Sequence, residues 1–254
     1  MGWLDWARSR TAGKAAGSAL PELGWDFHCH LVPGVDDGAR DLDEALRTIE
    51  ALRAQGYRGA VVTPHIYGGV FDNDAAGLRE AFAGLQRAVE GRFELQLAAE
   101  YHANDLLFEL IERDELLHTE IDGERCVLVE FPYLMEAPRG MDALVALRGA
   151  GYRPILAHVE RYRYVQAHVE PWLQRLRQLE VLLQCNIGSL AGMYGQGPQQ
   201  LARQLLAQGV PDLWGSDVHR PQQVQRYIAP GLRLLAPKGA PNPGVRPQPQ
   251  RKAA

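Results

Sequence analysis

The chain has 254 residues, of which 46% are hydrophobic and 23% charged, and its formal net charge at neutral pH is -4. This is the composition of an ordinary globular protein that is long enough to bury a core, and a single domain is the default expectation. A net negative charge gives no attraction to a nucleic-acid backbone or to an anionic membrane, so neither is an expected partner.

The two ends of the chain differ in composition from the middle. Residues 1–24 are rich in small and basic side chains and are expected to form an arm, either a mobile tail or a short helix with a sticky side. Residues 236–254 are dominated by Pro, Gly and polar residues and are expected to be disordered. The oligomeric state stays open, and a homo-oligomer assembled through the arm is one alternative.

Export and membrane insertion are not expected. The N-terminus lacks the apolar run of a secretion signal, and no stretch approaches the roughly 18 apolar residues of a membrane span. The three cysteines lie far apart, form no CxxC pair and are odd in number, so they fit no closed disulfide framework. A reducing cytoplasm is the simplest location.

Between residues 25 and 235, apolar segments rich in β-forming residues alternate with segments of helical period. The expected strands are WDFH, GAVVTPH, FELQLAAEYH, CVLVEF, RPILAHVE, VLLQCN and PDLWGSDVH. The expected helices are LDEALRTIEALRAQG, DAAGLREAFAGLQRAVEG, residues 106–112, MDALVALRGAG, residues 161–179 and PQQLARQLLAQG. This alternation, with strands that are continuous apolar runs, is typical of a parallel sheet buried on both faces by helices. We predict an α/β fold, a distorted TIM-like (β/α)7 barrel.

Most of the expected strands end in a residue that can bind a metal ion. These residues are His28, His30, His65, Glu100, Glu130, His158, Asp217 and His219. In a parallel barrel the carboxyl ends of different strands converge on one mouth, where catalytic groups gather. The shared position predicts a metal site more strongly than any one of these residues does.

Taken singly, several of these signals have ordinary structural explanations. His28 and His30 lie on one face of a strand and can chelate an ion, but a lone HxH is more often incidental. Asp36 and Asp37 fit turn or cap positions before the next helix. His65 fits a polar loop. The sequence DVH repeats the spacing at the last strand, and this joint occurrence favours metal binding.

Glu100 and Glu130 carry more weight, because each closes an apolar run in which a buried carboxylate without a cation costs several kcal/mol. The set has too many ligands for one catalytic zinc, so two or three ions are expected. Imidazole and carboxylate ligands without a thiolate suit Mn, Fe or Zn. Cys29 lies between His28 and His30, points away from them by alternation and is expected in the core.

Clustered divalent ions suit displacement at phosphorus by a metal-activated water. Arg161 follows His158 closely and is placed to hold a phosphate by two hydrogen bonds, the alternative being a surface pair with Glu160. Arg220, beside His219, is a second candidate for binding substrate. None of the cysteines has an arginine six positions later, and no GxSxG occurs, so thiol and serine hydrolases are not supported.

The string DFHCHLVPGVDDGA, followed in order by TPH, AAEYH, LVEF, AHVERY, NIGSLAGMYG and SDVH, resembles the polymerase-and-histidinol-phosphatase (PHP) superfamily. More narrowly, it is similar to the bacterial manganese-dependent protein tyrosine phosphatases that act with tyrosine autokinases in capsule and exopolysaccharide production. The resemblance covers residues from about 25 to about 230. It implies a distorted barrel of the PHP type and a hydrolase for phosphotyrosine.

The resemblance also implies roles for individual residues. Arg161 would bind the phosphate and, with His65 and Asp37, act in catalysis. The implied ion is Mn²⁺, with Fe or Zn as alternatives, and the implied substrate is the phosphotyrosine tail of a cytoplasmic bacterial tyrosine kinase. The implied ligand sets are His28, His30, Glu100 and Asp217 for one ion, Glu100, Glu130 and His158 for a second, and Asp37, His65 and His219 for a third.

Three other functions remain as alternatives. One is a small-molecule phosphatase of the same superfamily, for example one that acts on histidinol phosphate. Another is a metal-dependent nuclease, which the net charge and the lack of an evident basic stripe disfavour. The last is a binding or scaffold protein that keeps the site without turnover.

Overall fold

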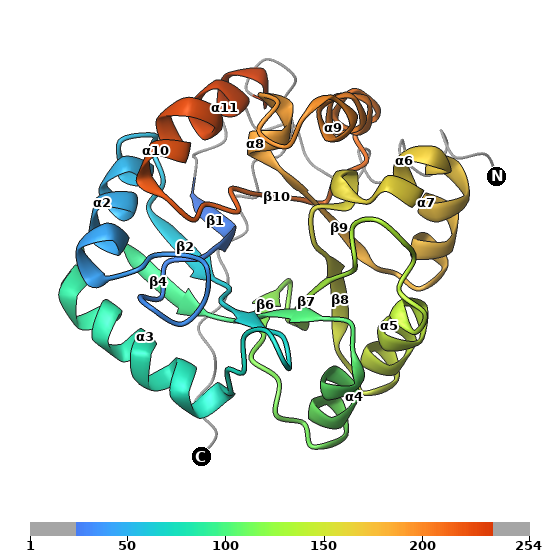
Figure 1. The fold of residues 1–254 in the computed structure, drawn as a ribbon, viewed down its shortest axis with the longest axis horizontal. Coiled ribbons are helices and arrows are strands. Elements are labelled where there is room, and N and C mark those ends of the chain that lie inside the picture. The colour runs from blue at the N-terminus through green and yellow to red at the C-terminus, as the bar shows by residue number, and fades with distance from the viewer. Residues whose placement is uncertain (1–23, 236–254) are drawn as a thin grey trace.

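In the computed structural model, residues 24–235 are described, and almost all of the predicted arm and the whole predicted tail lie outside the described residues. The described residues form a ring of strands with helices packed around its outside (Figure 1). The strands are β1 (Trp25–Cys29), β2 (Gly59–Val62), β3 (His65–Ile66), β4 (Glu94–Leu97), β5 (Glu100–His102), β6 (Thr119–Ile121), β7 (Glu124–Glu130), β8 (Arg153–Leu156), β9 (Leu182–Asn186) and β10 (Leu213–Gly215).

All strand pairs of the ring are parallel. Two strands of the ring are each divided into two short segments. A break at Pro64, which lacks a backbone donor, separates β2 from β3, and a break in the neighbouring strand separates β4 from β5. The ring then runs from β1 through these two broken strands to β7, β8, β9 and β10. Hydrogen bonds from Asp217 N to His28 O (2.7 Å) and from His30 N to Val218 O (3.1 Å) close it. The predicted distorted (β/α)7 barrel is therefore confirmed.

The helices cover the outside of the ring. They are α2 (Leu42–Arg53), α3 (Ala75–Val89), α4 (Asp105–Glu112), α5 (Gly140–Gly149), the 3₁₀ turn η1 (Val159–Arg161), α6 (Arg163–Ala167), α7 (Val169–Gln178), α8 (Ile187–Leu190), α9 (Gln196–Gln208), α10 (Pro221–Gln223), the π turn η2 (Val224–Ile228) and α11 (Ala229–Leu235). The side chains of Asp41, Asp74 and Asn104 cap α2, α3 and α4 at their N-termini. None of the helices in residues 24–235 is long and apolar enough to span a membrane.

Two hydrophobic clusters hold the ring together. The larger packs the outer face of the strands against the helices and includes Cys29, which is fully buried as predicted. The smaller draws residues from around the whole ring, such as Trp25, Phe27 and Leu128, and fills its inside. Trp25 and Phe27 therefore face the inside of the ring, whereas Cys29, two positions on, faces the helices. A register shift in β1 between Asp26 and Cys29 accompanies this change of face. Because apolar side chains fill the inside of the ring, the polar residues at the carboxyl ends of the strands lie together at one mouth of the ring.

One expectation about local structure was wrong, and one pair of strands was not predicted. The single helix expected over residues 161–179 is divided into η1, α6 and α7. The backbone is extended at Tyr162, between η1 and α6. Between α6 and α7, the ring of Pro171 would clash with the carbonyl of Ala167 in a continuous helix. The antiparallel pair of β6 with β7 was not expected. Its turn is Asp122-Gly123, with φ of 53° and 82°, which is a common hairpin signal.

Candidate metal centre

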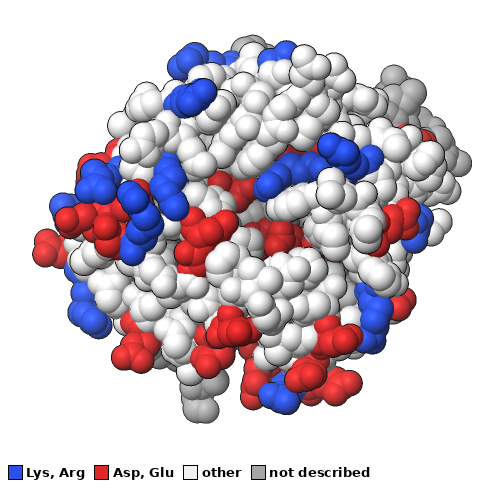
Figure 2. Space-filling view, viewed as in Figure 1, with Lys and Arg blue, Asp and Glu red and all other residues white. Residues whose placement is uncertain are grey.

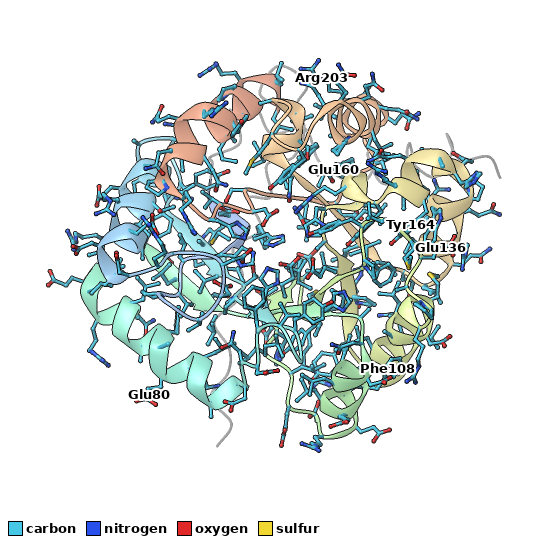
Figure 3. All side chains as sticks on the ribbon, in the orientation of Figure 1. Glu80, Phe108, Glu136, Glu160, Tyr164 and Arg203 are labelled. Atoms are coloured by element: carbon cyan, nitrogen blue, oxygen red, sulfur yellow. The ribbon has the colours of Figure 1, made fainter. Side chains whose placement is uncertain are left out.

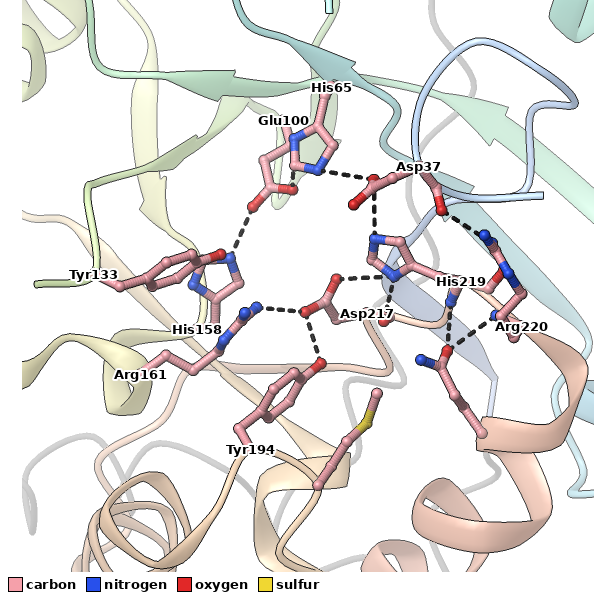
Figure 4. Close-up of a pocket in the computed structure, with 12 residues that line it drawn as sticks. Asp37, His65, Glu100, Tyr133, His158, Arg161, Tyr194, Asp217, His219 and Arg220 are labelled. Atoms are coloured by element: carbon pink, nitrogen blue, oxygen red, sulfur yellow. Dashed lines mark hydrogen bonds and ion pairs between the residues drawn. The ribbon is translucent and has the colours of Figure 1, made fainter. Parts of the chain in front are cut away.

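The residues predicted as metal ligands converge at the carboxyl-terminal mouth of the ring. Figure 3 shows side chains gathered in the middle of the ring, and Figure 4 shows Asp37, His65, Glu100, His158, Asp217 and His219 around one cavity. Several of them line a cavity of about 410 Å³. The structure brings together His28, His30, Asp37, His65, Glu100, Glu130, His158, Asp217 and His219, which are joined by contacts of 3.0 to 3.8 Å. They come from several strand ends, and Asp37 comes from the loop after β1, as expected from the parallel topology.

Four donor atoms form the deepest part of the cluster. His28 Nε2 lies 3.2 Å from His30 Nε2, 3.1 Å from Glu100 Oε2 and 3.5 Å from Asp217 Oδ1. His30 Nε2 lies 3.4 Å from each of the same two carboxylates. An ion held tetrahedrally with bonds of about 2.1 Å keeps its ligand atoms about 3.4 Å apart. The ligand atoms of His28, His30 and Asp217 all lie within 4.8 Å of one another and suit one small divalent ion, while Glu100 lies as close to His28 and His158.

The outward nitrogens of three histidines show why the cluster calls for a cation. Each Nδ1 faces an acceptor, so with an ion bound Nδ1 would carry the hydrogen and Nε2 would present a lone pair to the ion. The Nε2 atoms lie among carboxylate oxygens, a combination of groups that suits a cation. The acceptors are Gln184 Oε1 at 3.1 Å for His28, Asp36 Oδ2 at 2.9 Å for His30 and the Asp217 carbonyl at 2.9 Å for His219.

The electrostatic field at the centre favours positive charge. Burial lowers the pKa of His28, yet the charges of Glu100 and Asp217 raise it overall, to about 9. Burial, together with the charge of Glu100, raises the pKa of Glu130 to about 8. Both shifts have the same origin, an excess of carboxylates in a space that water does not reach, which a bound cation would relieve.

Glu100 connects this inner group to a second one. Its Oε1 lies 3.0 Å from His158 Nε2, and His158 Nε2 lies 3.8 Å from Glu130 Oε2. Glu130 also accepts a hydrogen bond of 3.1 Å from the hydroxyl of Tyr133. Burial and then the charge of Arg161 lower the pKa of His158 to about 4, so its imidazole stays neutral and able to bind an ion.

A third group lies nearer the solvent. Asp37 Oδ1 is 3.3 Å from His219 Nε2 and 3.6 Å from His65 Nε2, and the side chain of Asp37 is 57% exposed. The ring of His30 stacks on that of His219 at 4.2 Å. The side chain of the neighbouring Asp36 is buried and serves both as a turn residue, accepting from Gly38 N, and as the partner of His30.

Arg161 faces the cavity and is held on several sides. Its Nη1 donates to Asp217 Oδ2 at 2.9 Å, and the same oxygen accepts from Asn186 Nδ2 at 2.7 Å and from the hydroxyl of Tyr194 at 2.8 Å. The guanidinium lies 4.3 Å from the ring centre of Tyr133 and 4.1 Å from that of Tyr194. These contacts fix the plane of the guanidinium beside the metal-ligand cluster.

The alternative pairing of Arg161 with Glu160 is not observed. The Glu160 carboxylate is buried, where it accepts from Asn186 N at 3.0 Å and from Ser189 Oγ at 2.6 Å. It thereby ties the turn that carries His158 and Arg161 to the segment after β9.

Arg220 lines the cavity and also has a structural contact. Its Nη1 donates to the backbone carbonyls of Asp37 (2.9 Å), His219 (2.7 Å) and Gly38. These bonds join the loop of Asp37 to the end of the last strand. A role for Arg220 in binding substrate stays a prediction.

Some residues of the site were missed from the sequence. Gln184 and Asn186 are fully buried, and the Gln184 oxygen accepts from the backbone N–H of His158 at 2.8 Å as well as facing His28. Their spacing of two in the apolar segment VLLQCN places both on one face of a strand, as for HxH, and was a usable signal. Tyr133 and Tyr194 lie in loops, where no periodic pattern marks them.

The ring fold, with imidazole and carboxylate groups gathered at the carboxyl ends of its strands, is that of a metallohydrolase-type barrel. The chain belongs to the family described as capsular polysaccharide synthesis, CpsB/CapC, whose model matches residues 24–239.

Known proteins similar to the chain include members of this family. Tyrosine-protein phosphatase YwqE of Bacillus subtilis is 30% identical over 83% of each chain, and a putative tyrosine-protein phosphatase CapC of Staphylococcus aureus is 27% identical over 76% of each. A crystal structure from the work on YwqE of Bacillus subtilis and CpsB of Streptococcus pneumoniae, described as metal-dependent tyrosine phosphatases, superposes with a TM-score of 0.75. It has 24% identity and covers 87% of this chain and 89% of that one, so it supports the fold.

Proposed function

We propose that the chain is a metal-dependent protein-tyrosine phosphatase that hydrolyses phosphotyrosine. The observation that carries the proposal is the cluster of inward-facing histidine nitrogens and carboxylates with the fixed guanidinium of Arg161 beside it. The family relatives named as tyrosine-protein phosphatases support the substrate class. A role in capsule or exopolysaccharide production agrees with the description of the family.

The proposed ion ligands are the three sets that the resemblance implies, and the contacts within the cluster support them. Mn²⁺ is the proposed ion, with Fe and Zn as alternatives that the same donor chemistry accepts. Divalent ions bound there would supply the Lewis acidity that activates water for attack at phosphorus and offsets the charge of the leaving oxygen. The proposed sets are His28, His30, Glu100 and Asp217, then Glu100, Glu130 and His158, then Asp37, His65 and His219.

The residues of the chain itself would orient the phosphate ester. Arg161 presents a planar group of donors to the cavity, and its contacts with Asp217 and two tyrosine rings hold that plane before the substrate arrives. This saves the entropy that a mobile arginine would lose on binding. His65 and Asp37, at the solvent side of the cluster, are the other proposed catalytic residues. Arg220 would keep the Asp37 loop in place and contribute positive charge.

The proposed physiological substrate is the phosphotyrosine tail of a bacterial tyrosine kinase. Figure 2 shows acidic groups in a hollow at the mouth of the ring, with basic side chains beside it. A phosphorylated side chain can enter such a hollow from a peptide on the surface. A cytoplasmic location is part of the proposal and is supported by three free, buried cysteines.

The test is phosphate release by metal-stripped protein to which Mn²⁺, Fe²⁺, Zn²⁺ or Mg²⁺ is added back, with a phosphotyrosine peptide and histidinol phosphate as substrates. We expect turnover of the peptide by the wild type and by His168→Ala, a control on the surface, and at least a hundredfold less by His158→Ala. No release from the peptide with any ion would overturn the proposal. A strong preference for histidinol phosphate would replace it with the small-molecule phosphatase.

A further inference from the structure

A second cavity, also of about 410 Å³, borders the candidate metal centre. It shares Tyr133, Arg161 and Tyr194 with the first cavity, so the two cavities adjoin at the aromatic pair that holds the Arg161 guanidinium. We call it the side groove. Its remaining lining residues are Leu134, Arg163, Gln166, Gln196, Gly197 and Pro198.

The side groove is positively charged in a protein of net negative charge. Two arginines line it and no acidic residue does. Arg161 is engaged by Asp217, whereas the exposed side chain of Arg163 has no ion pair or hydrogen bond within residues 24–235. Figure 2 shows basic side chains beside the acidic hollow, on the side of the ring where Figure 1 places α6. An uncompensated guanidinium at this place favours an anionic ligand.

The base of the side groove is fixed by backbone contacts. Arg163 N donates to the carbonyl of Tyr133 at 2.9 Å, and the hydroxyl of the buried Tyr162 accepts from Phe131 N at 3.0 Å. Gln166 Nε2 donates to the carbonyl of Glu160 at 2.8 Å. The backbone of Arg163 is therefore fixed, and its exposed guanidinium lies in solvent beside the side groove.

We propose that the side groove binds the peptide that flanks the phosphotyrosine and selects an acidic residue there through Arg163. The proposal rests on the proposed function, because it assigns the groove to the same substrate. An extended peptide advances about 3.3 to 3.6 Å per residue, so a residue within three positions of the tyrosine reaches along a neighbouring groove. Leu134, which is 70% exposed, gives the groove an apolar wall for the peptide backbone and side chains.

The test compares kcat/KM for three phosphotyrosine peptides that carry Glu, Gln or Lys at the three positions on each side of the tyrosine. Turnover of p-nitrophenyl phosphate, which is too short to reach the side groove, is the reference for each protein. The variants are Arg163→Gln, Arg163→Glu and, as a matched control, Arg113→Gln, an exposed arginine directly after α4 that lines neither cavity.

We expect the wild type and Arg113→Gln to prefer the Glu peptide to the Gln peptide by about two- to fivefold, and to lose this preference at high salt. In Arg163→Gln the preference disappears, and in Arg163→Glu it moves to the Lys peptide. Equal use of the peptides by the wild type, or a preference for Glu that survives in Arg163→Gln, would overturn the side-groove proposal alone. Turnover of no phosphotyrosine substrate would instead overturn the proposed function, and this inference with it.

Discussion

Gln184 joins two of the proposed metal ligands from within the barrel, and its replacement by Met tests the reasoning about the centre most directly. Its side-chain oxygen accepts from His158 N at 2.8 Å and faces His28 Nδ1 at 3.1 Å. Its nitrogen donates to Asn186 Oδ1 at 2.8 Å. Met has a similar length and shape but offers only a weak acceptor, so the packing is kept and the hydrogen bonds are lost.

The magnitude follows from the groups that lose their partners. A buried donor without an acceptor costs about 1 to 3 kcal/mol, so two such donors should lower the free energy of unfolding of the metal-free Gln184→Met protein by about 2 to 6 kcal/mol. The ring of His28 also loses the contact that holds its tautomer. Loss of such a contact weakens metal binding by about 10- to 100-fold.

Urea unfolding of the metal-free protein measures the first effect, and competition with a chromophoric chelator for Mn²⁺ or Zn²⁺ measures the second. Gln174→Met, at an exposed position on α7, is the matched control and should change neither quantity. If Gln184→Met kept both the unfolding free energy and the metal affinity of the wild type, the assignment of Gln184 as the group that orients His28 would be refuted.

Three further predictions follow from the site. Chelation of metal should lower the thermal unfolding midpoint and added Mn²⁺ should restore it, because an ion at a hundred times its dissociation constant stabilises the folded state by about 2.7 kcal/mol. An unchanged midpoint in differential scanning calorimetry would argue against ions at this cluster. Arg161→Lys should reduce kcat/KM for a phosphotyrosine peptide by about 10- to 100-fold, because Lys lacks the planar group of donors and the stacking on Tyr133 and Tyr194. Metal affinity, measured by competition with a chelator, should change less than kcat/KM does. Gly38→Ala should weaken binding of the ion proposed at Asp37, His65 and His219, because a Cβ at Gly38 comes within 2.4 Å of His30 O and must displace the loop that carries Asp37. A metal titration of the variant that matches the wild type would contradict this prediction.

The barrel and most of its candidate ligands could be predicted from the sequence, because the patterns that mark them are local. Alternation along a strand places His28 and His30 on one face, and an apolar run that closes on Glu100 or Glu130 marks a strand end whatever the rest of the chain does. Parallel order then brings those ends to one mouth. The break before Pro171 and the hairpin turn at Asp122-Gly123 are also marked by local sequence signals, so both could have been predicted from the sequence.

Other features depend on closure of the ring and had no local signal. Glu100 meets His28 across 72 positions of sequence, and Gln184 meets it across 156. Their separation of about 3 Å depends on strand register and tilt, which no short segment encodes. The placing of Tyr133 and Tyr194 on either side of Arg161 depends on two loops whose course is set by the strands that they connect. The sequence by itself therefore determined which histidine and carboxylate side chains lie at the mouth of the barrel. Only the tertiary structure decided which atoms face one another there, since those distances come from long-range packing.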